Sequence, residues 1–261
     1  MSTTKFVIIT GGVLSGLGKG TATAAIARLL QNGKRIVTIK CDGYLNVDPG
    51  TMNPVEHGEV FVLEDGGEVD MDFGHYERFL GVPCKFDWNL TSGKVFHRVI
   101  ERERRGDFLG KTIQIFPHVI NEIQQWWYEI AEREHADIMM IEIGGTIGDI
   151  ENSWFTEAAR QLKRRVGDDV VYIHLTYVPF LDSVGEPKTK PAQRDVALVG
   201  MHSYNPLCAH LHHGCRVRLI EADGGAFDAT AHDGDDHAHA PHVTRALQDR
   251  LHVLHRTQAT P

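Results

Sequence analysis

The 261-residue sequence lacks a long apolar segment, an excess of positive charge and a cysteine framework. No apolar run approaches the roughly 20 residues of a membrane-spanning helix, and the N-terminal MSTTKFVIIT is unlike a signal peptide. The net charge of −8 argues against nucleic acid or an anionic membrane as the main partner. Four cysteines without a CxxC pair are typical of reduced thiols rather than of disulfides or a zinc site. We therefore expect a cytoplasmic protein.

The composition, with 42% hydrophobic and 24% charged residues, is that of an ordinary globular chain. Short apolar runs predict buried strands, and apolar residues at helical spacing predict helices. We expect strands at 5–10, 35–40, 112–116, 137–143 and 169–177, and helices at 20–31, 92–105, 117–134 and 153–166. The weakly periodic segment 41–86 is expected to be a long functional loop. This alternation predicts an α/β fold with a mostly parallel sheet flanked by helices.

A glycine-rich segment, GGVLSGLGKGT at 11–21, lies between the first expected strand and helix. Glycines let backbone N–H groups converge on phosphate oxygens, the helix N-terminus attracts anions, and Lys19 supplies a positive charge. The segment departs from GxxxxGK[ST], because Val13 replaces a glycine and Gly20 replaces the hydroxyl residue, a role that Thr21 is a candidate to fill. The spacing from Gly12 to Gly18 is typical of dethiobiotin-synthetase-like P-loop proteins. We predict a P-loop NTPase-type fold, with a purely structural glycine turn as the alternative.

Three carboxylates are candidates for holding Mg²⁺ near this loop. Asp70 and Asp72 are two positions apart, so in an extended segment both side chains point the same way. Glu142 ends the apolar run DIMMIEI, at the sheet edge where α/β proteins bind ligands, and burying it unpaired would be costly. A carboxylate there can reach a Mg²⁺ bound to a triphosphate. For Asp70 and Asp72, a solvated acidic loop is an equally good interpretation.

Several longer runs resemble the amidoligase (synthetase) domain of the CTP synthase family, in that family's order and approximate spacing. They are GGVLSGLGKGT, DGYLNVDPGTMNPVEHGEVFV, DMDFGHYERF, ERRGDFLGKTIQIFPH, EIGGTIGDIE and GEPKTKPAQ. The resemblance covers about 5–194. It implies that ATP phosphorylates O4 of the uracil ring of UTP and that ammonia then displaces phosphate to give CTP.

The resemblance also assigns roles to individual residues. Lys19 and Lys40 match catalytic cations, Asp72 and Glu142 match Mg²⁺ ligands, and Gln114 and His118 match a segment that approaches the pyrimidine nucleotide across a subunit contact. ATP binding is implied for Gly16, Leu17, Gly18, Lys19, Gly20, Thr21 and Asp72. Binding of UTP, or of CTP as inhibitor, is implied for Ser15, Asp149, Ile150, Glu151, Lys188, Thr189, Lys190, Pro191, Ala192 and Gln193.

The implied partners are UTP, ATP, ammonia and further copies of the chain, since the family forms tetramers that share UTP sites. None of the four cysteines lies in the glycine-rich elbow of the family's glutaminase domain, so free ammonia or a separate glutaminase is the expected nitrogen source. The alternative is a catalytically impaired nucleotide-binding homologue that acts through oligomerisation. A partitioning-type P-loop ATPase would share the loop but not GHYERF or KTKPAQ.

The character of the sequence changes after residue 194. Lys190 is the last lysine, and ten of the 16 histidines lie between His202 and His255. We therefore divide the chain into an amidoligase-like domain at 1–194 and a divergent, His-rich tail at 195–261. The tail's histidines suit transition-metal binding, but Asp-interleaved histidines are also typical of disordered tails. Smaller departures from the family pattern are Gly43, where it usually has proline, and Ala192, where it has threonine.

Overall fold

The computed structural model describes residues 4–12, 16–178, 180–181, 186–187, 190–191 and 194, together with three strand segments between 207 and 230. Its main sheet has eight strands in the order β12-β11-β10-β7-β1-β6-β2-β5. Pairing is parallel from β10 to β5, whereas β11 and β12 are antiparallel. The strands are β1 (Lys5–Gly11), β2 (Ile36–Asp42), β5 (Asn89–Thr91), β6 (Ile138–Ile143), β7 (Val170–Val178), β10 (Leu207–His212), β11 (Arg216–Ile220) and β12 (Ala226–Thr230).

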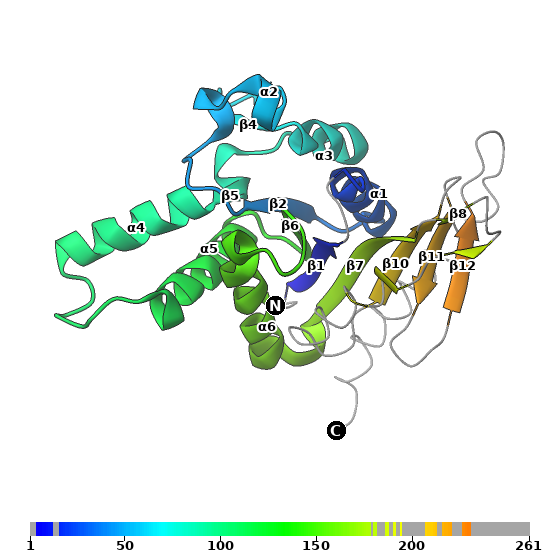
Figure 1. Ribbon diagram of the computed structural model, residues 1–261. Coiled ribbons are helices and arrows are strands. Elements are labelled where there is room, and N and C mark those ends of the chain that lie inside the picture. The colour runs from blue at the N-terminus through cyan, green and yellow to red at the C-terminus, as the bar shows by residue number, and fades with distance from the viewer. Residues whose placement is uncertain are drawn as a thin grey trace.

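Helices cover both faces of this sheet (Figure 1). The helices of the described residues are α1 (Lys19–Leu30), α2 (Pro54–His57), α3 (Asp72–Leu80), α4 (Ser92–Arg105), α5 (Ile120–Arg133) and α6 (Ser153–Val166), of which α2 lies beside the hairpin at 60–70, away from the sheet. Two short hairpins pair β3 (Val60–Val62) with β4 (Glu68–Asp70) and β8 (Phe180–Leu181) with β9 (Glu186–Pro187). A mostly parallel sheet with helices on both sides, and a glycine turn between β1 and α1, confirms the predicted fold class.

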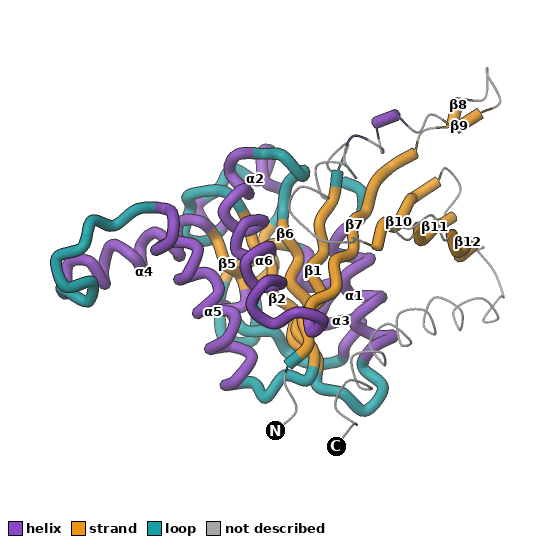
Figure 2. Tube along the Cα trace, turned by 90° about the horizontal axis from the view of Figure 1, so that it is seen from below, coloured by secondary structure: helices purple, strands orange, loops and turns teal. Residues whose placement is uncertain are grey.

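Alternating side chains of β1 pack into two separate apolar cores. Val7 and Ile9 pack with Ala27 and Leu30 of α1. Phe6 and Ile8 instead belong to the larger core, which contains Ile123 and Trp127 of α5 and Phe155 of α6. Burial on both faces explains why β1 is a continuous apolar run. Figure 2, which views the molecule from below, shows α5 and α6 lying over the strands.

The expected strand at 112–116 is wrong. Residues 111–114 are loop, and Ile115–Val119 form a π-helical turn containing a cis Phe116–Pro117 peptide bond before α5 begins at Ile120. Residues 114–116 are exposed, and the described structure places no strand beside them, so the run has no ladder to join. The predicted loop at 41–86 is also wrong in part, because it contains α2, β3, β4 and the whole of α3.

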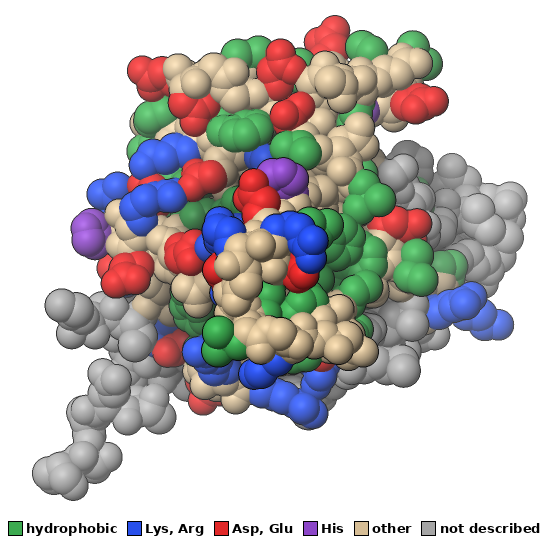
Figure 3. All heavy atoms as spheres, turned by 90° about the vertical axis from the view of Figure 1, so that its left-hand side faces the viewer, with side chains coloured by type: hydrophobic (Ala, Val, Ile, Leu, Met, Phe, Trp, Pro, Cys, Tyr) green, Lys and Arg blue, Asp and Glu red, His purple; other side chains and the backbone are tan. Residues whose placement is uncertain are grey.

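The α4–α5 connection projects from the sheet at one end of the molecule (Figure 1). At that end, positive and negative side chains alternate around an apolar area (Figure 3). Leu109, Ile115 and Phe116 of this connection are exposed hydrophobic residues. Among the described helices, none is long and apolar enough to cross a bilayer.

Lys94, in the first turn of α4, is a buried lysine without a carboxylate partner in the described structure. Its ammonium group donates hydrogen bonds to the carbonyl oxygens of Phe86 (3.0 Å) and Asn89 (2.9 Å) and lies 3.3 Å from the centre of the Phe86 ring. Burial lowers the pKa of Lys94 to about 8, against the opposing effect of Asp48 and other, more distant carboxylates. A neutral amine still has two N–H donors for the two carbonyls.

This environment predicts a pH-dependent stability. The folded-state pKa of Lys94 is below its unfolded value, so above about pH 8 the unfolded chain binds a proton that the folded chain has lost. From about pH 7.5 to about pH 10, the free energy of unfolding should therefore rise by about 2 kcal/mol relative to that of Lys94→Met. Urea unfolding at both pH values measures this difference. Lys34→Met, at an exposed lysine, should show the same pH dependence of the free energy of unfolding as the wild type. The prediction is contradicted if this free energy changes with pH equally in Lys94→Met and Lys34→Met.

Candidate functional site

The candidate site lies where three neighbouring parallel strands, β1, β2 and β6, reach their carboxyl ends. The glycine turn at 11–18 follows β1, Asp42 ends β2, and the turn at 144–148 follows β6. This edge of an open α/β sheet is where such folds bind ligands. The three segments are held together by backbone hydrogen bonds, from Gly144 N–H to Cys41 O (2.7 Å) and from Ile147 N–H to Gly11 O (2.8 Å).

The described part of the glycine turn brings two left-handed glycines and a lysine to the start of α1. Gly16 and Gly18 adopt φ of 76° and 78°, a left-handed conformation that favours glycine. Lys19 is the first residue of α1, and its ammonium group donates a 2.7 Å hydrogen bond to Gly145 O. Its side chain passes so close to Gly11 that a Cβ there would lie 2.7 Å from Lys19 Cδ. Burial, reinforced by Lys40, lowers the pKa of Lys19, while Glu142 and Asp72 oppose the shift.

Lys40 is buried near the end of β2 and forms ion pairs with three carboxylates. Its ammonium nitrogen lies 2.7 Å from Asp72 Oδ2, 3.1 Å from Asp70 Oδ2 and 3.5 Å from Asp42 Oδ1. Burial alone would lower the pKa of Lys40, but these carboxylates and Glu142 raise it well above its usual value. The structure therefore brings Asp70 and Asp72 to one cation, although Asp70 ends β4 and Asp72 begins α3 instead of sharing an extended segment.

Glu142 lies beside Lys40 in the sheet register and is fully buried. The Tyr76 hydroxyl donates a 2.5 Å hydrogen bond to its Oε2, whereas Oε1 has no hydrogen-bond partner in the described structure. Burial raises the pKa of Glu142 to about 7, with Asp72 adding to the shift and Lys40 opposing it. Its side chain shares the sheet face of Ile138 and Met140, which pack in the core that contains α1 residues.

Asp72 gives a steric reason for glycine at position 20 of the glycine-rich segment, where the standard phosphate loop has serine or threonine. A Cβ on Gly20 would lie 1.9 Å from Asp72 Oδ1, so the carboxylate fills the space that a side chain at position 20 would need. In the standard loop, serine or threonine at this position places its hydroxyl on Mg²⁺. Thr21, the sequence candidate for that role, is exposed on α1.

The residues of this cluster are compatible with Mg²⁺ in two respects. Glu142 Oε1 is a buried carboxylate oxygen that lacks a partner, and Asp72 and Glu142 are oxygen donors of the kind that Mg²⁺ prefers. The described residues contain no group of three or more His, Cys, Asp or Glu side chains arranged to hold a metal ion. A bound Mg²⁺ would thus depend on two carboxylates together with phosphate and water oxygens, its usual coordination beside nucleotides.

The residues expected to bind the pyrimidine nucleotide are only partly described. Asp149 shapes the turn after β6, since its Oδ2 accepts a 2.7 Å hydrogen bond from Thr146 N–H, and Ile150 and Glu151 are exposed beside it. Lys190 and Pro191 are exposed as well. The remaining predicted positions, Ser15, Lys188, Thr189, Ala192 and Gln193, lie outside the described residues.

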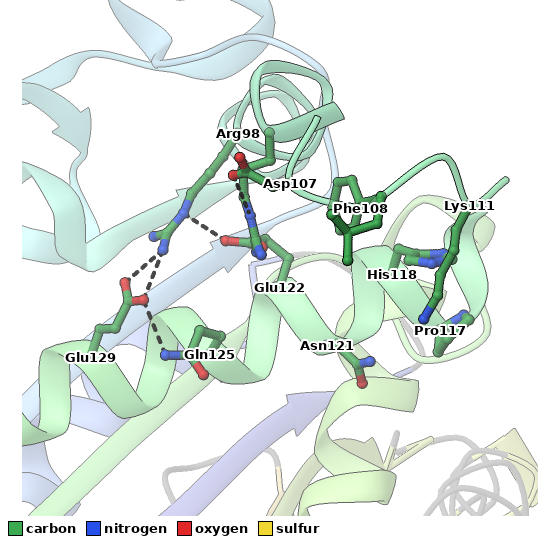
Figure 4. Close-up of a pocket in the computed structure, with 12 residues that line it drawn as sticks. Arg98, Asp107, Phe108, Lys111, Pro117, His118, Asn121, Glu122, Gln125 and Glu129 are labelled. Atoms are coloured by element: carbon green, nitrogen blue, oxygen red, sulfur yellow. Dashed lines mark hydrogen bonds and ion pairs between the residues drawn. The ribbon is translucent and has the colours of Figure 1, made fainter. Parts of the chain in front are cut away.

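Gln114 and His118 belong to a different part of this single chain. Gln114 N–H donates a 3.1 Å hydrogen bond to His118 Nδ1, and His118 packs edge-on against Phe108. His118 lines a cleft of about 580 Å³ between α4 and α5 (Figure 4). Within the cleft, Arg98 and Arg102 form ion pairs with buried Glu122. No described hydrogen bond or ion pair connects Gln114 or His118 to the cluster around Lys40.

Sequence reasoning missed Tyr76 and Asp42. Tyr76 follows Asp72 by four positions, so on a helix both side chains lie on one face. Had α3 been predicted as a helix, this spacing would have indicated that Tyr76 lies near the carboxylate cluster. Asp42 directly follows the lysine-bearing strand, but an acidic residue there has no signature that separates it from a loop residue. The structure brings Lys19, Lys40, Asp72 and Glu142 near one another, while the roles assigned to them stay predictions.

The contact between Gly20 and Asp72 predicts an unusual substitution effect. Alanine is favoured over glycine in a helix by about 1 kcal/mol, but Gly20→Ala must displace the Asp72 carboxylate and should not stabilise the chain. Asp72→Gly removes the three atoms nearest to that Cβ, so in this background the same substitution should be more favourable than in the wild type, by up to about 1 kcal/mol in the free energy of unfolding. Urea unfolding of the four variants tests this cycle; equal stabilisation in both backgrounds would refute it.

Comparison with known proteins identifies related chains. The protein-family model described as CTP synthase N-terminus matches residues 5–207. The CTP synthase of Borreliella burgdorferi is 55% identical over 193 residues, which cover 74% of this chain and 36% of that protein. The CTP synthase of Methanopyrus kandleri is 55% identical over 194 residues, with the same coverage. The chain thus matches only about a third of the length of these relatives.

Similarity to solved structures is more distant. The signal recognition particle receptor FtsY from Elizabethkingia anophelis in complex with GDP has a TM-score of 0.40 at 10% identity, covering 80% of this chain and 49% of that one. Cobyrinic acid a,c-diamide synthase from Mycobacterium smegmatis with ADP and magnesium has a TM-score of 0.31 at 10% identity, covering 77% and 83%. These likenesses are too weak to bear on function. The family match over most of the chain, together with its lysine and carboxylate cluster, shows that this chain belongs to the CTP synthase family.

Proposed function

We propose that the chain performs the ligase reaction of its family, the ATP-dependent amination of UTP to CTP with ammonia. The observation that carries the proposal is the convergence of Lys19, Lys40, Asp72 and Glu142 at the carboxyl edge of the sheet, in a chain that belongs to this family. Each of these residues was expected from the phosphate loop, from the strand ends or from the resemblance.

Charge balance supports this assignment. ATP and UTP together carry roughly eight negative charges, and their repulsion must be offset for both to bind side by side. The described cluster contains Lys19 and Lys40 but also four carboxylates, so its formal charge is −2 when all six groups are ionised. An acidic cluster of this kind is unsuited to polyphosphate alone but well suited to polyphosphate together with a divalent cation.

Asp72 and Glu142 would hold the Mg²⁺. When bound, this ion neutralises triphosphate charge and helps to orient the transferred phosphoryl group. Lys19, at the start of α1, would bind the β and γ phosphates in place of the Gly145 carbonyl. Lys40 remains fully charged because of its carboxylate neighbours and would stabilise charge on the phosphoryl group during transfer.

The chemistry then proceeds in two steps. The uracil O4 of UTP attacks the γ phosphorus of ATP while N3 loses its proton to solvent, the bond to the bridging oxygen breaks, and ADP leaves. Ammonia next adds to C4 and loses a proton, and the C4–O4 bond breaks to release phosphate and give CTP. Ser15, Asp149, Ile150, Glu151 and the segment from Lys188 to Gln193 would hold UTP, or CTP as an inhibitor.

We further propose that the chain acts as a homo-oligomer, a tetramer by analogy with its family. Gln114 and His118 lie away from the Lys40 cluster in the single chain, and His118 lines the α4–α5 cleft. Exposed Leu109, Ile115 and Phe116 nearby give this end of the molecule the apolar character of a contact surface. In an oligomer these two residues would approach the pyrimidine nucleotide of a neighbouring copy.

The reaction is tested by following CTP formation by absorbance with UTP, ATP, Mg²⁺ and ammonium chloride. Wild type should turn over, and Lys19→Ala and Asp72→Ala should each lose at least about a hundredfold in kcat, because the first removes a cation from the phosphates and the second removes a proposed ligand of Mg²⁺. Lys34→Ala, at an exposed lysine near the opposite edge of the sheet, should retain full activity. A folded wild type that binds UTP but forms no CTP would instead identify a nucleotide-binding homologue without catalytic activity.

A further inference from the structure

We propose that Tyr76 is a positioning residue, whose hydroxyl orients the Glu142 carboxylate so that Oε1 faces the metal ion of bound ATP. The inference rests on the proposed function only in assuming that a divalent cation binds at Glu142. It extends that function because it assigns a role to a residue that touches neither nucleotide nor metal.

Helix α3 carries Asp72 and Tyr76 on the same face, because residues four apart on a helix are neighbours. Asp72 contacts the Lys40 ammonium group, and the Tyr76 hydroxyl reaches Glu142 on β6. The two carboxylates expected to hold the metal, one on a helix and one on a strand, are therefore set relative to each other through this single helix. A shift of α3 would move both.

The Tyr76 ring has little freedom to move. It is fully buried and packs edge-on against Phe73 of the same helix, with ring centroids 5.3 Å apart and planes at 67°. Its hydroxyl is thereby fixed in front of Glu142 Oε2, at 2.5 Å. A hydrogen bond from a rigid donor restrains the terminal torsion of the carboxylate, which is otherwise broad.

The consequence is visible at the other oxygen. Glu142 Oε1 is buried and has no hydrogen-bond partner in the described structure, an arrangement that costs free energy unless a ligand completes it. An unpaired oxygen on a buried carboxylate is more costly than an unpaired neutral group, so this oxygen calls for a ligand that completes it. The geometry therefore favours a Tyr76 hydroxyl that satisfies one carboxylate oxygen and leaves the other for a metal ion.

The test measures metal-dependent nucleotide binding instead of turnover. Isothermal titration with a non-hydrolysable ATP analogue, with and without Mn²⁺, gives the factor by which the metal tightens binding. Residues that orient metal ligands typically contribute 10- to 100-fold to metal affinity, so Tyr76→Phe should reduce this factor by about tenfold or more. Tyr172→Phe is the matched control, because Tyr172 is also buried but its hydroxyl has no hydrogen-bond partner in the described structure.

The second part of the test asks whether Tyr76 acts through Glu142. Glu142→Gln should abolish most of the Mn²⁺ effect, and adding Tyr76→Phe to it should cause no further loss. Glu142→Asp keeps the charge but withdraws the carboxylate from Tyr76, and it should lose Mn²⁺ dependence as Tyr76→Phe does. This variant also provides the test if Tyr76→Phe does not fold.

The proposal is overturned by an unchanged Mn²⁺ factor in folded Tyr76→Phe, or in Glu142→Asp. It is also overturned if Tyr76→Phe reduces the Mn²⁺ factor equally in the wild type and in Glu142→Gln. A wild type that binds the analogue equally well with and without Mn²⁺ overturns it too. CTP formation is not part of these measurements. A chain that shows the predicted coupling yet makes no CTP would therefore contradict the proposed function and leave the role of Tyr76 standing.

Discussion

The buried ammonium group of Lys40 is the interaction on which the candidate site depends. It contacts carboxylates from three separate segments, namely the end of β2, the end of β4 and the start of α3, and it lies beside Glu142 of β6. A lysine buried to this extent stays charged only because those carboxylates surround it, and the carboxylates tolerate one another only because of the lysine. Neither set is stable in this position without the other.

The contacts with Lys40 explain how the irregular segment between β2 and α3 contributes carboxylates to the candidate site. The segment between β2 and α3 has only short elements, yet it supplies Asp70, and Asp72 begins α3 directly after it. Leu63 and Val69 of this segment pack in the larger core, and its acidic end contacts the sheet at Lys40 and α1 at Gly20. The departure from the standard phosphate loop then has a steric reason: a carboxylate from α3 occupies the space that the usual hydroxyl side chain would fill.

The sequence predicted best those strands that are buried on both faces. The strands β1, β2, β6 and β7 are apolar on both faces because helices cover both, and this leaves a continuous apolar run in the sequence. The run at 112–116 has similar residue types but is exposed and has no neighbouring strand in the described structure. Residue preference cannot separate these cases, since a strand needs a partner as well as suitable side chains.

The sequence by itself predicted a glycine-rich turn with its lysine after β1 and a carboxylate near the end of β6, because each follows directly from neighbouring residues along the chain. The division at residue 194 stays a prediction, although three strands between 207 and 230 extend the sheet. Only the tertiary structure decided which carboxylates meet Lys40, that Asp72 replaces a hydroxyl at Gly20, and that Tyr76 holds Glu142. The contacts of Asp72 with Lys40 and of Tyr76 with Glu142 join residues 32 and 66 positions apart, and they depend on how α3 packs against α1, which no local pattern encodes.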